Sequence, residues 1–330
     1  MKTPLNFQSF VGNRHVVEIL RRAVKQERLP HALIFAGPPG VGKRTLAELL
    51  AQRLNCLQPK DQEACCACIS CRKIMAGTHP DVRVVRPEGT VIRIEQVRDM
   101  IREIAYQPFE GRYRVVILDP ADQMKQEAAN CLLKTLEEPP SRSILILITS
   151  KPYLLLGTIR SRARVLQLGP LAADVIENHL VVQEGRTLED ARLATALSNG
   201  SLSAALACDV SRHREIRGTA LRFVSLLLRK GSFAEVSTLA ANETKEKEPF
   251  QAWIELAQTL LQDVYCAKVA PRRMGQPEIA GELTALAQAT PRAAVVAAIE
   301  ALQQLREAVP LNVNRQLALE ALFLSEISRQ

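Results

Sequence analysis

Five of the eight cysteines lie within one short stretch of the chain. Four of them follow the spacing C-x8-C-x2-C-x2-C, and they are Cys56, Cys65, Cys68 and Cys71. Thiolates at this spacing can converge on one tetrahedral Zn²⁺ ion, and four sulfur ligands leave no position open for catalysis. The stretch 56–71 therefore predicts a structural zinc site that orders a loop too polar to fold alone. An iron–sulfur cluster and free thiols without metal are the alternatives. Cys66 is an extra member, and His79 is expected to be a loop residue rather than a ligand.

A glycine-rich segment follows a short apolar run at 32–36, and it reads Gly37-Pro38-Pro39-Gly40-Val41-Gly42-Lys43. It matches the start of a phosphate-binding loop, in which backbone N–H groups face a polyphosphate and the lysine neutralises it. The next position should hold Mg²⁺ through a hydroxyl, but Arg44 stands there and Thr45 comes one residue late. One residue turns a helical side chain by about 100°, so Thr45 does not replace that hydroxyl. The loop predicts a site for ATP or ADP, or one that binds nucleotide poorly or not at all.

A second ATPase element should be an apolar strand that ends in Asp-Glu, where Asp organises Mg²⁺ and Glu activates water. The run 115–118 supplies the strand and Asp119 the first carboxylate. Pro120 occupies the glutamate position and has no side chain that can accept a proton. Together with Arg44, this change predicts that the chain does not hydrolyse ATP by itself.

Apolar runs alternate with helical patterns through the first half of the chain. The predicted strands are 32–36, 82–85, 115–118 and 144–148, and the predicted helices are 14–28, 45–54, 94–104 and 124–138. Such alternation is typical of βαβ units, so we expect an α/β domain with a mostly parallel sheet.

After Pro170 the composition shifts to alanine and leucine, and strand-like runs become rare. A few short helices are expected over 171–208. The longer helical patterns are 213–229, 250–270, 291–307 and 312–328. We therefore predict three domains: 1–167 with the cysteine insert, a small helical domain at 168–210, and an all-helical domain at 211–330.

The amino-acid composition indicates which kinds of partner the chain can bind. The net charge of +8 over 330 residues is mild, and aromatic residues make up only 4%. This low aromatic content argues against a platform that stacks the bases of single-stranded nucleic acid, and any contact with DNA should go to phosphates. No apolar run reaches the roughly 18 residues of a membrane-spanning helix, and Met1-Lys2-Thr3-Pro4 leads into no signal core. We expect a cytoplasmic protein with no membrane partner.

These residues resemble a known family, the AAA+ clamp loaders of bacterial DNA polymerase III, and within it the delta-prime chains. The segments that carry the resemblance, besides the glycine-rich loop and the cysteines, are Leu29-Pro30-His31-Ala32, Gly77-Thr78-His79-Pro80-Asp81, the run from Asn130 to Pro140, and Ile159-Arg160-Ser161-Arg162. The resemblance covers about residues 1–210. Beyond them it rests mainly on Asn312-Val313-Asn314, which opens a leucine-rich helix.

The resemblance implies a subunit of a ring that opens a sliding clamp and places it on primed DNA. Its partners would be motor ATPase subunits and delta, and residues 211–330 would form a collar. In this family Ser-Arg-Cys carries an arginine finger that acts on a neighbouring ATP site, and this chain has Ser161-Arg162-Ala163. Arg162 is then the finger, although it could also be one of several arginines in a basic loop with Arg160 and Arg164. Ser203 stands where motor subunits often have a nucleotide-sensing arginine.

Two other functions compete with this interpretation. The first is a motor-type clamp-loader ATPase that tolerates the changed motifs, and Pro120 argues against it because a motor needs a carboxylate there. The second is an AAA+ or nucleic-acid adaptor outside replication. The four-cysteine insert and the run from Leu132 to Pro140 argue against that role. We therefore expect a subunit of the polymerase III assembly without catalytic activity of its own.

Overall fold

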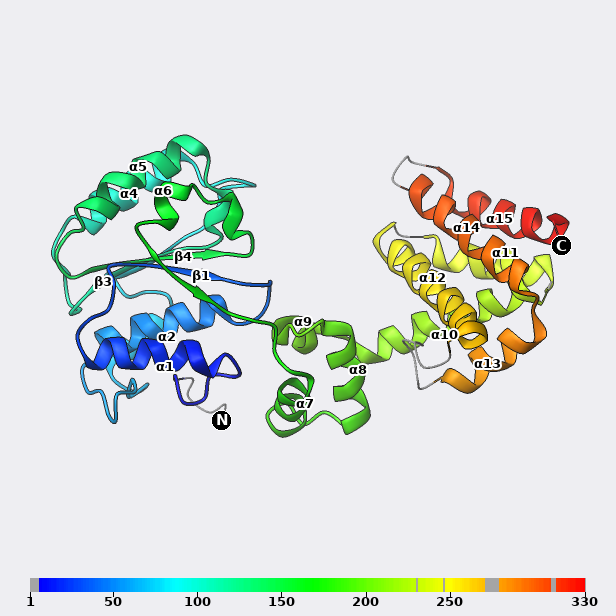
Figure 1. The fold of residues 1–330 in the computed structure, drawn as a ribbon, viewed down its shortest axis with the longest axis horizontal. Coiled ribbons are helices and arrows are strands. Elements are labelled where there is room, and N and C mark those ends of the chain that lie inside the picture. Colours follow the sequence, from blue (N-terminus) through cyan, green and yellow to red (C-terminus); the bar gives the residue numbers. More distant parts are fainter. Residues whose placement is uncertain (1–5, 230, 246, 271–278, 310–312, 330) are drawn as a thin grey trace. The chain divides into compact units, whose positions relative to one another are not determined.

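The computed structural model describes residues 6–229, 231–245, 247–270, 279–309 and 313–329. The chain forms two compact units, Met1–Cys208 and Asp209–Gln330. The first unit contains a sheet with helices on both faces, and the described part of the second is built of helices (Figure 1).

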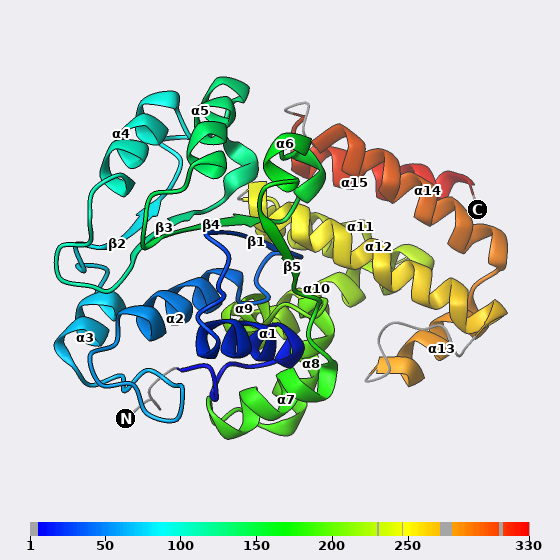
Figure 2. The same ribbon diagram turned by 60° about the vertical axis from the view of Figure 1, so that its left-hand side comes forward.

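The sheet of the first unit is parallel throughout, with strands in the order β2-β3-β4-β1-β5 (Figure 2). The strands are β1 (Ala32–Ala36), β2 (Val82–Val85), β3 (Arg114–Leu118), β4 (Ser143–Thr149) and β5 (Arg164–Gln167). β1 and β4 are buried along their whole length, as expected of strands covered on both faces. Because β3, β4 and β1 are neighbours, their carboxyl ends meet at one edge of the sheet, where the glycine-rich loop and Asp119 follow.

Helices cover both faces of this sheet (Figure 1). On one face lie α1 (Arg14–Lys25) and α2 (Lys43–Asn55), and on the other lie α4 (Ile94–Ile104), α5 (Gln126–Glu137) and α6 (Gly157–Arg160). Alternate residues of β1 point to opposite faces, and Ile34 packs with Val97 of α4 and Leu132 of α5 in one buried cluster. Helix α3 (Ile69–Met75) follows the cysteine loop and packs against α2.

The predicted fold class is confirmed, and the four predicted strands occur as β1 to β4. The alternative that grouped Arg164 with Arg160 and Arg162 in a basic loop needs correction, because Arg164 begins β5, whose side chains are mostly exposed. A strand at the edge of a sheet with a polar outer face lacks the apolar run that marks a buried strand, so the sequence did not predict it.

The first unit ends in three short helices, α7 (Ala173–Val182), α8 (Leu188–Ser198) and α9 (Leu202–Ala207). The side-chain oxygens of Thr187 and Ser201 accept hydrogen bonds from Asp190 N and Ala204 N, which caps α8 and α9. These helices belong to the same compact unit as the sheet. The division into domains at 167 and 210 stays a prediction.

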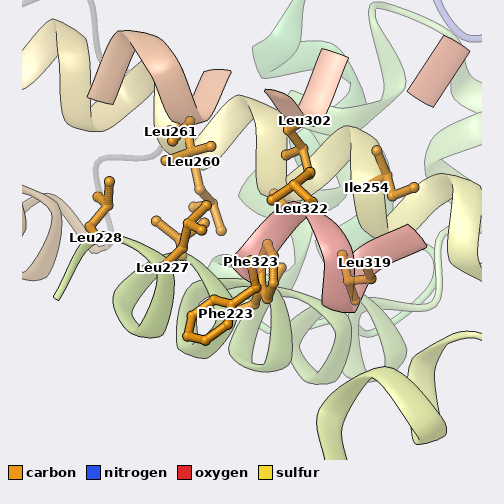
Figure 3. Packing of buried hydrophobic residues seen from close by; sticks show 14 of the residues in the cluster. Phe223, Leu227, Leu228, Ile254, Leu260, Leu261, Leu302, Leu319, Leu322 and Phe323 are labelled. Carbon is orange, nitrogen blue, oxygen red and sulfur yellow. The ribbon is translucent and has the colours of Figure 1, made fainter. Parts of the chain in front are cut away.

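The second unit contains six helices in its described part. They are α10 (Val210–Leu228), α11 (Phe233–Glu243), α12 (Lys247–Val269), α13 (Ala280–Ala289), α14 (Arg292–Ala308) and α15 (Arg315–Arg329). Figure 3 shows Phe223 of α10 and Phe323 of α15 in the buried cluster of this unit, together with Leu302 of α14. Trp253 packs against Phe223 with ring centroids 5.1 Å apart, and its indole nitrogen donates to Thr219 Oγ1 at 3.0 Å.

The start of the last helix matches the predicted pattern where it is described. Asn312 lies outside the described residues. The Asn314 side chain accepts a hydrogen bond from Leu317 N at 3.2 Å and so caps the first turn of α15. Within the described ranges, none of the helices combines the length and the apolar character needed to cross a bilayer.

Candidate functional site

The glycine-rich loop connects the end of β1 with the start of α2. Gly42 precedes α2 with φ +92°, a conformation that favours glycine. Gly40 also has positive φ, and a Cβ atom there would lie 2.0 Å from Ser201 Oγ. Ser203 N donates a hydrogen bond to Gly40 O at 3.1 Å. The start of α9 therefore packs directly on the loop, and Ser203 contacts the loop through its backbone.

Lys43, the first residue of α2, is folded back onto the loop. Its Nζ donates to Gly37 O and Pro38 O, both at 2.7 Å, and its side chain is buried. Burial lowers the pKa of this ammonium group, while the charges of Asp119 and Asp122 oppose the shift. The loop carbonyls thus orient the lysine that would meet a phosphate.

Arg44 lies beside the carboxylate at the end of β3. Its Nε donates to Glu48 Oε1 at 2.8 Å, and its Nη1 is 3.9 Å from Asp119 Oδ2. Burial raises the pKa of Asp119, and the positive charges of Arg44 and Lys43 act in the opposite direction. A guanidinium therefore stands next to the carboxylate that would hold Mg²⁺ in an ATPase, and the following residue, Pro120, offers no second carboxylate.

These residues line one cavity of about 620 Å³, a size that suits a small-molecule ligand. Of the predicted nucleotide-site residues, Gly40, Gly42, Lys43, Arg44, Thr45 and Asp119 line it. Gly37 is not in the lining, although its carbonyl holds Lys43.

The sequence did not predict several other lining residues, which are Phe10, Val11, Thr149, Ser150, His179 and Leu206. Thr149 and Ser150 stand at the carboxyl end of β4, next to that of β1. That position was the available signal, because ligands gather at the carboxyl ends of parallel strands.

The four predicted ligand cysteines converge, with their sulfur atoms all within 4.8 Å of one another. A Zn–S bond of 2.3 Å would place tetrahedral sulfurs about 3.8 Å apart, and Cys65 Sγ and Cys71 Sγ are 4.0 Å apart. Backbone N–H groups point at the sulfurs: Cys65 N to Cys56 Sγ at 3.2 Å and Cys68 N to Cys65 Sγ at 3.3 Å. The donor set fits one tetrahedral metal ion, and the extra Cys66 is not in it.

The cysteine cluster cannot carry four negative charges unaided. Burial raises the pKa of the Cys56 and Cys71 thiols. Burial also acts on Cys65, but N–H groups of Ala67 and Cys68 and the neighbouring thiols lower its pKa to about 6. A bound cation would deprotonate such thiols and balance their charge.

The cysteine loop is tied to the rest of the unit by polar contacts. Glu63 is buried, accepts a hydrogen bond from Phe7 N at 2.9 Å and pairs with Arg21. His79 lies nearby but is engaged elsewhere: Nε2 is 3.1 Å from Ser70 Oγ, and Nδ1 accepts from Asp81 N at 3.1 Å. Both ring nitrogens are used, which agrees with the prediction that His79 is no metal ligand.

Arg162 follows α6 and does not line the cavity. Its Nη2 is 2.7 Å from Glu137 Oε1, and its Nη1 donates to Thr158 O at 3.1 Å and to Ser161 Oγ at 3.3 Å. The side chain remains partly exposed. The structure thus links two segments that the sequence analysis singled out separately, the run that contains Glu137 and the Ser161-Arg162 pair.

Comparison with known proteins gives the family. The model of a family described as "DNA polymerase III, delta subunit" matches residues 12–172. DNA polymerase III subunit delta' of Pseudomonas aeruginosa is 34% identical, over 89% of this chain and 90% of its own length. The chain belongs to the DNA polymerase III delta' family. The delta' subunit of Bacillus subtilis is 35% identical over 64% of this chain, which spans 63% of that relative's length. The tau subunit of Escherichia coli is 33% identical over 62% of this chain and 32% of its own length.

Solved structures of related size are more distant. A gamma subunit-related protein of Thermotoga maritima overlaps with a TM-score of 0.42 at 20% identity and covers 94% of this chain and 98% of its own. The clamp loader delta protein of Bacillus subtilis gives a TM-score of 0.36 at 15% identity, with 94% and 99% covered. The family assignment rests on the sequence identity to the delta' relatives.

Proposed function

We propose that this chain is a clamp-loader subunit of bacterial DNA polymerase III that does not hydrolyse ATP itself. The observation that carries the proposal is the position of Arg44, whose Nη1 lies 3.9 Å from Asp119 Oδ2. An arginine offers no acceptor for a metal ion, and its charge competes with Mg²⁺ for the same carboxylate. Pro120 removes the base that would activate water. A motor-type ATPase, the second candidate, would need both a hydroxyl that holds Mg²⁺ at position 44 and a carboxylate that activates water at position 120.

We assign to this subunit the role of supplying an arginine finger, Arg162, to the ATP site of a neighbouring subunit. Phosphoryl transfer places negative charge on the γ-phosphate oxygens, and a guanidinium from a neighbouring chain can stabilise it. Arg162 is accessible, and Glu137, Thr158 O and Ser161 Oγ restrict its side chain. Such restriction reduces the conformational entropy that an arginine loses when it engages a phosphate. These contacts support a finger that is positioned before the neighbouring site forms.

Residues 211–330 are proposed to be the collar that joins this subunit to its neighbours. Leu319 and Phe323 of α15 are buried in the unit's own core, whereas Leu317 and Leu324 are 61% and 48% exposed. Positions seven residues apart share one helix face. Exposed leucines on one face of α15 support a contact with another helical subunit.

The cysteine cluster is assigned a structural Zn²⁺ ion. Its four sulfurs would leave no open coordination position, and the loop 56–68 has little apolar core besides the cysteines and Ala64. The proposed partners are motor ATPase subunits and delta, together with the sliding clamp and primed DNA. DNA would be contacted through phosphates, since the chain has a net charge of +8 but few aromatic residues.

The test uses the reconstituted clamp loader with and without changes in this subunit. Arg162→Ala should leave assembly intact and lower the ATPase activity that clamp and primed DNA stimulate, together with clamp loading. Arginine fingers are worth about 10³–10⁵ in rate in GTPases, and the loss here should be smaller because several sites share the work. The isolated wild-type chain should show no ATPase activity above background.

Matched controls are the neighbouring exposed arginines, changed as Arg160→Ala and Arg164→Ala. Arg160 ends α6 and Arg164 begins β5, and each should lower the rate much less. Wild-type loading by the Arg162→Ala complex would refute the finger, and robust turnover by the isolated chain would favour the motor alternative.

A further inference from the structure

The residue that follows the lysine of the phosphate loop, Arg44, is positively charged. In a metal-dependent site, the hydroxyl after the lysine and the aspartate at the strand end hold a divalent ion beside the phosphates. Here Arg44 replaces the hydroxyl, and its guanidinium lies between Glu48 and Asp119, at 2.8 Å and 3.9 Å. The positive charge that a metal ion would supply is thus present on a side chain.

The residues that remain do not fit Mg²⁺. This ion needs near-octahedral oxygen ligands at about 2.0–2.1 Å, and Arg44 provides none. Asp119 is already beside a positive charge, and the carboxylate of Asp122 accepts a hydrogen bond from the Thr149 hydroxyl. A metal ion at this position would have to displace the Arg44 guanidinium from Glu48 and Asp119, and that guanidinium would repel it.

A polyphosphate, in contrast, still fits the cavity. The loop keeps the positive φ of Gly40 and Gly42 and places Lys43 at the start of α2. The cavity of about 620 Å³ also has apolar walls, formed in part by Phe10 and Leu206. A guanidinium presents paired donors to phosphate oxygens and stays charged. Glu48 engages Nε of Arg44, while the side chain is 37% exposed and lines the cavity.

We infer that this cavity binds a nucleoside polyphosphate such as ADP without a divalent cation, with the Arg44 guanidinium in the place of the metal. Lys43 and the loop N–H groups hold the phosphates, and the apolar walls receive the base. The inference deepens the proposed non-hydrolysing function and rests on it, because a site without Mg²⁺ retains nucleotide as a ligand and does not turn it over.

The experiment measures ADP binding to the full chain by titration calorimetry, in excess Mg²⁺ and in excess EDTA. The expected dissociation constants agree within about twofold, a difference well below the 1.4 kcal/mol that corresponds to a factor of ten. The variant Arg44→Gln should bind about 10- to 100-fold more weakly in both buffers, because it loses a charge-assisted contact. In Arg44→Thr the hydroxyl returns, so binding should become stronger with Mg²⁺ than with EDTA.

Arg22→Gln is the control, because Arg22 also pairs with a glutamate four residues away, Glu18 on α1, in the reverse order, and does not line the cavity. It should bind ADP like the wild type. Circular dichroism and zinc content show whether each variant is folded.

Three results would overturn the inference: no ADP binding by the wild type, binding that requires Mg²⁺, or equal affinity of wild type and Arg44→Gln. Failure of the proposed function is a separate outcome, since ATP hydrolysis by the wild type in the same samples would refute the non-hydrolysing role. Magnesium-dependent binding without hydrolysis would overturn the inference alone.

Discussion

Helix α2 connects two sites of opposite character. At its first residue, Lys43 and the glycine-rich loop keep the shape of a phosphate site, but Arg44 and Pro120 replace the groups that chemistry requires. Directly after its last residue, Cys56 begins a cluster of four cysteines whose sulfur atoms lie within 4.8 Å of one another. At the first end the backbone conformation of a phosphate loop is present, but the side chains at positions 44 and 120 differ from those of an ATPase. At the other end all four cysteines of a metal-binding pattern are present.

The difference shows what each site needs. A structural metal site depends on its complete donor set, because each missing thiolate weakens the metal and the loop that it folds. A phosphate loop derives much of its binding from backbone N–H groups and a lysine. It can therefore lose hydrolysis and keep its shape.

The largest effect is expected at the cysteine end. Cys68→Ser removes one of four thiolates, so the chain should lose its metal and the loop 56–68 should unfold. Structural zinc contributes apparent binding energies of about 10–16 kcal/mol in small domains at neutral pH. Elemental analysis of the purified protein and proteolysis of the loop would measure both losses.

Cys66→Ser is the matched control for this change. Cys66 stands in the same loop but not in the ligand set, so the variant should keep full metal content. A wild-type protein without zinc, or a Cys68→Ser protein that retains it, would contradict the zinc assignment.

The next effect concerns the buried polar network beside the carboxyl end of α2. Asp81 is buried and accepts hydrogen bonds from Phe109 N, Glu110 N and Gly111 N at 2.7–2.8 Å, and it pairs with Arg114 at 3.0 Å. Asp81→Ala should lower the free energy of unfolding by about 3–5 kcal/mol, because Arg114 loses its carboxylate partner and keeps only the carbonyls of Glu103 and Gln107. Urea unfolding followed by circular dichroism would measure the change, with the exposed Asp99→Ala expected within about 0.5 kcal/mol of the wild type.

Asp81 should also make the free energy of unfolding depend on pH. Burial would raise the pKa of Asp81, but the three N–H groups and Arg114 prevail and lower it below the ordinary value of 3.8. A carboxyl group whose pKa is lower in the folded state stabilises the fold above its unfolded pKa, and this contribution disappears as pH falls through the folded value. The difference between wild type and Asp81→Ala should therefore shrink below about pH 4. A difference that is independent of pH would contradict the ionised state of Asp81.

The smallest effect is expected from repair of the phosphate end. The double variant Arg44→Thr with Pro120→Glu restores the metal hydroxyl and the base, so it should hydrolyse ATP slowly in Mg²⁺, above the background of the wild type. General-base catalysis alone contributes about 10²–10⁴ in rate, but the finger of a neighbouring chain is absent in the isolated subunit. Release of phosphate measures turnover, and Pro120→Glu alone is the control. Equal rates for all three proteins would mean that other residues also prevent hydrolysis.

The sequence predicted most of the sheet because buried parallel strands carry continuous apolar runs. Ala32–Ala36 and Ser143–Thr149 are buried throughout and were recognised. β5 was missed because its residues are mostly exposed. Helix α11 was missed for a related reason: its buried residues are Val236, Leu239 and Ala240, a weak pattern that gains its meaning from packing against other helices.

The candidate sites also differ in how much of them the sequence could predict. The cysteine ligands stand within sixteen positions of one another, so spacing alone brought them together. Arg44 and Asp119 are far apart in sequence, and their approach depends on β1 and β3 lying on either side of β4. The pairing of Arg162 with Glu137 likewise arises from the packing of α6 on α5, and no local pattern encodes it.

The contact of Glu63 with Phe7 N has a consequence for both ends of α2. Phe7 lies within a turn whose ends, Asn6 and Ser9, bond each other twice at 2.9 Å, and Phe10, directly after the turn, lines the cavity beside Gly42. The cysteine loop thus contacts the segment that supplies Phe10 to the lining of the cavity. If the proposed Zn²⁺ ion and nucleotide both bind, thermodynamic reciprocity applies to them: the factor by which the metal changes the nucleotide affinity equals the factor by which the nucleotide changes the metal affinity.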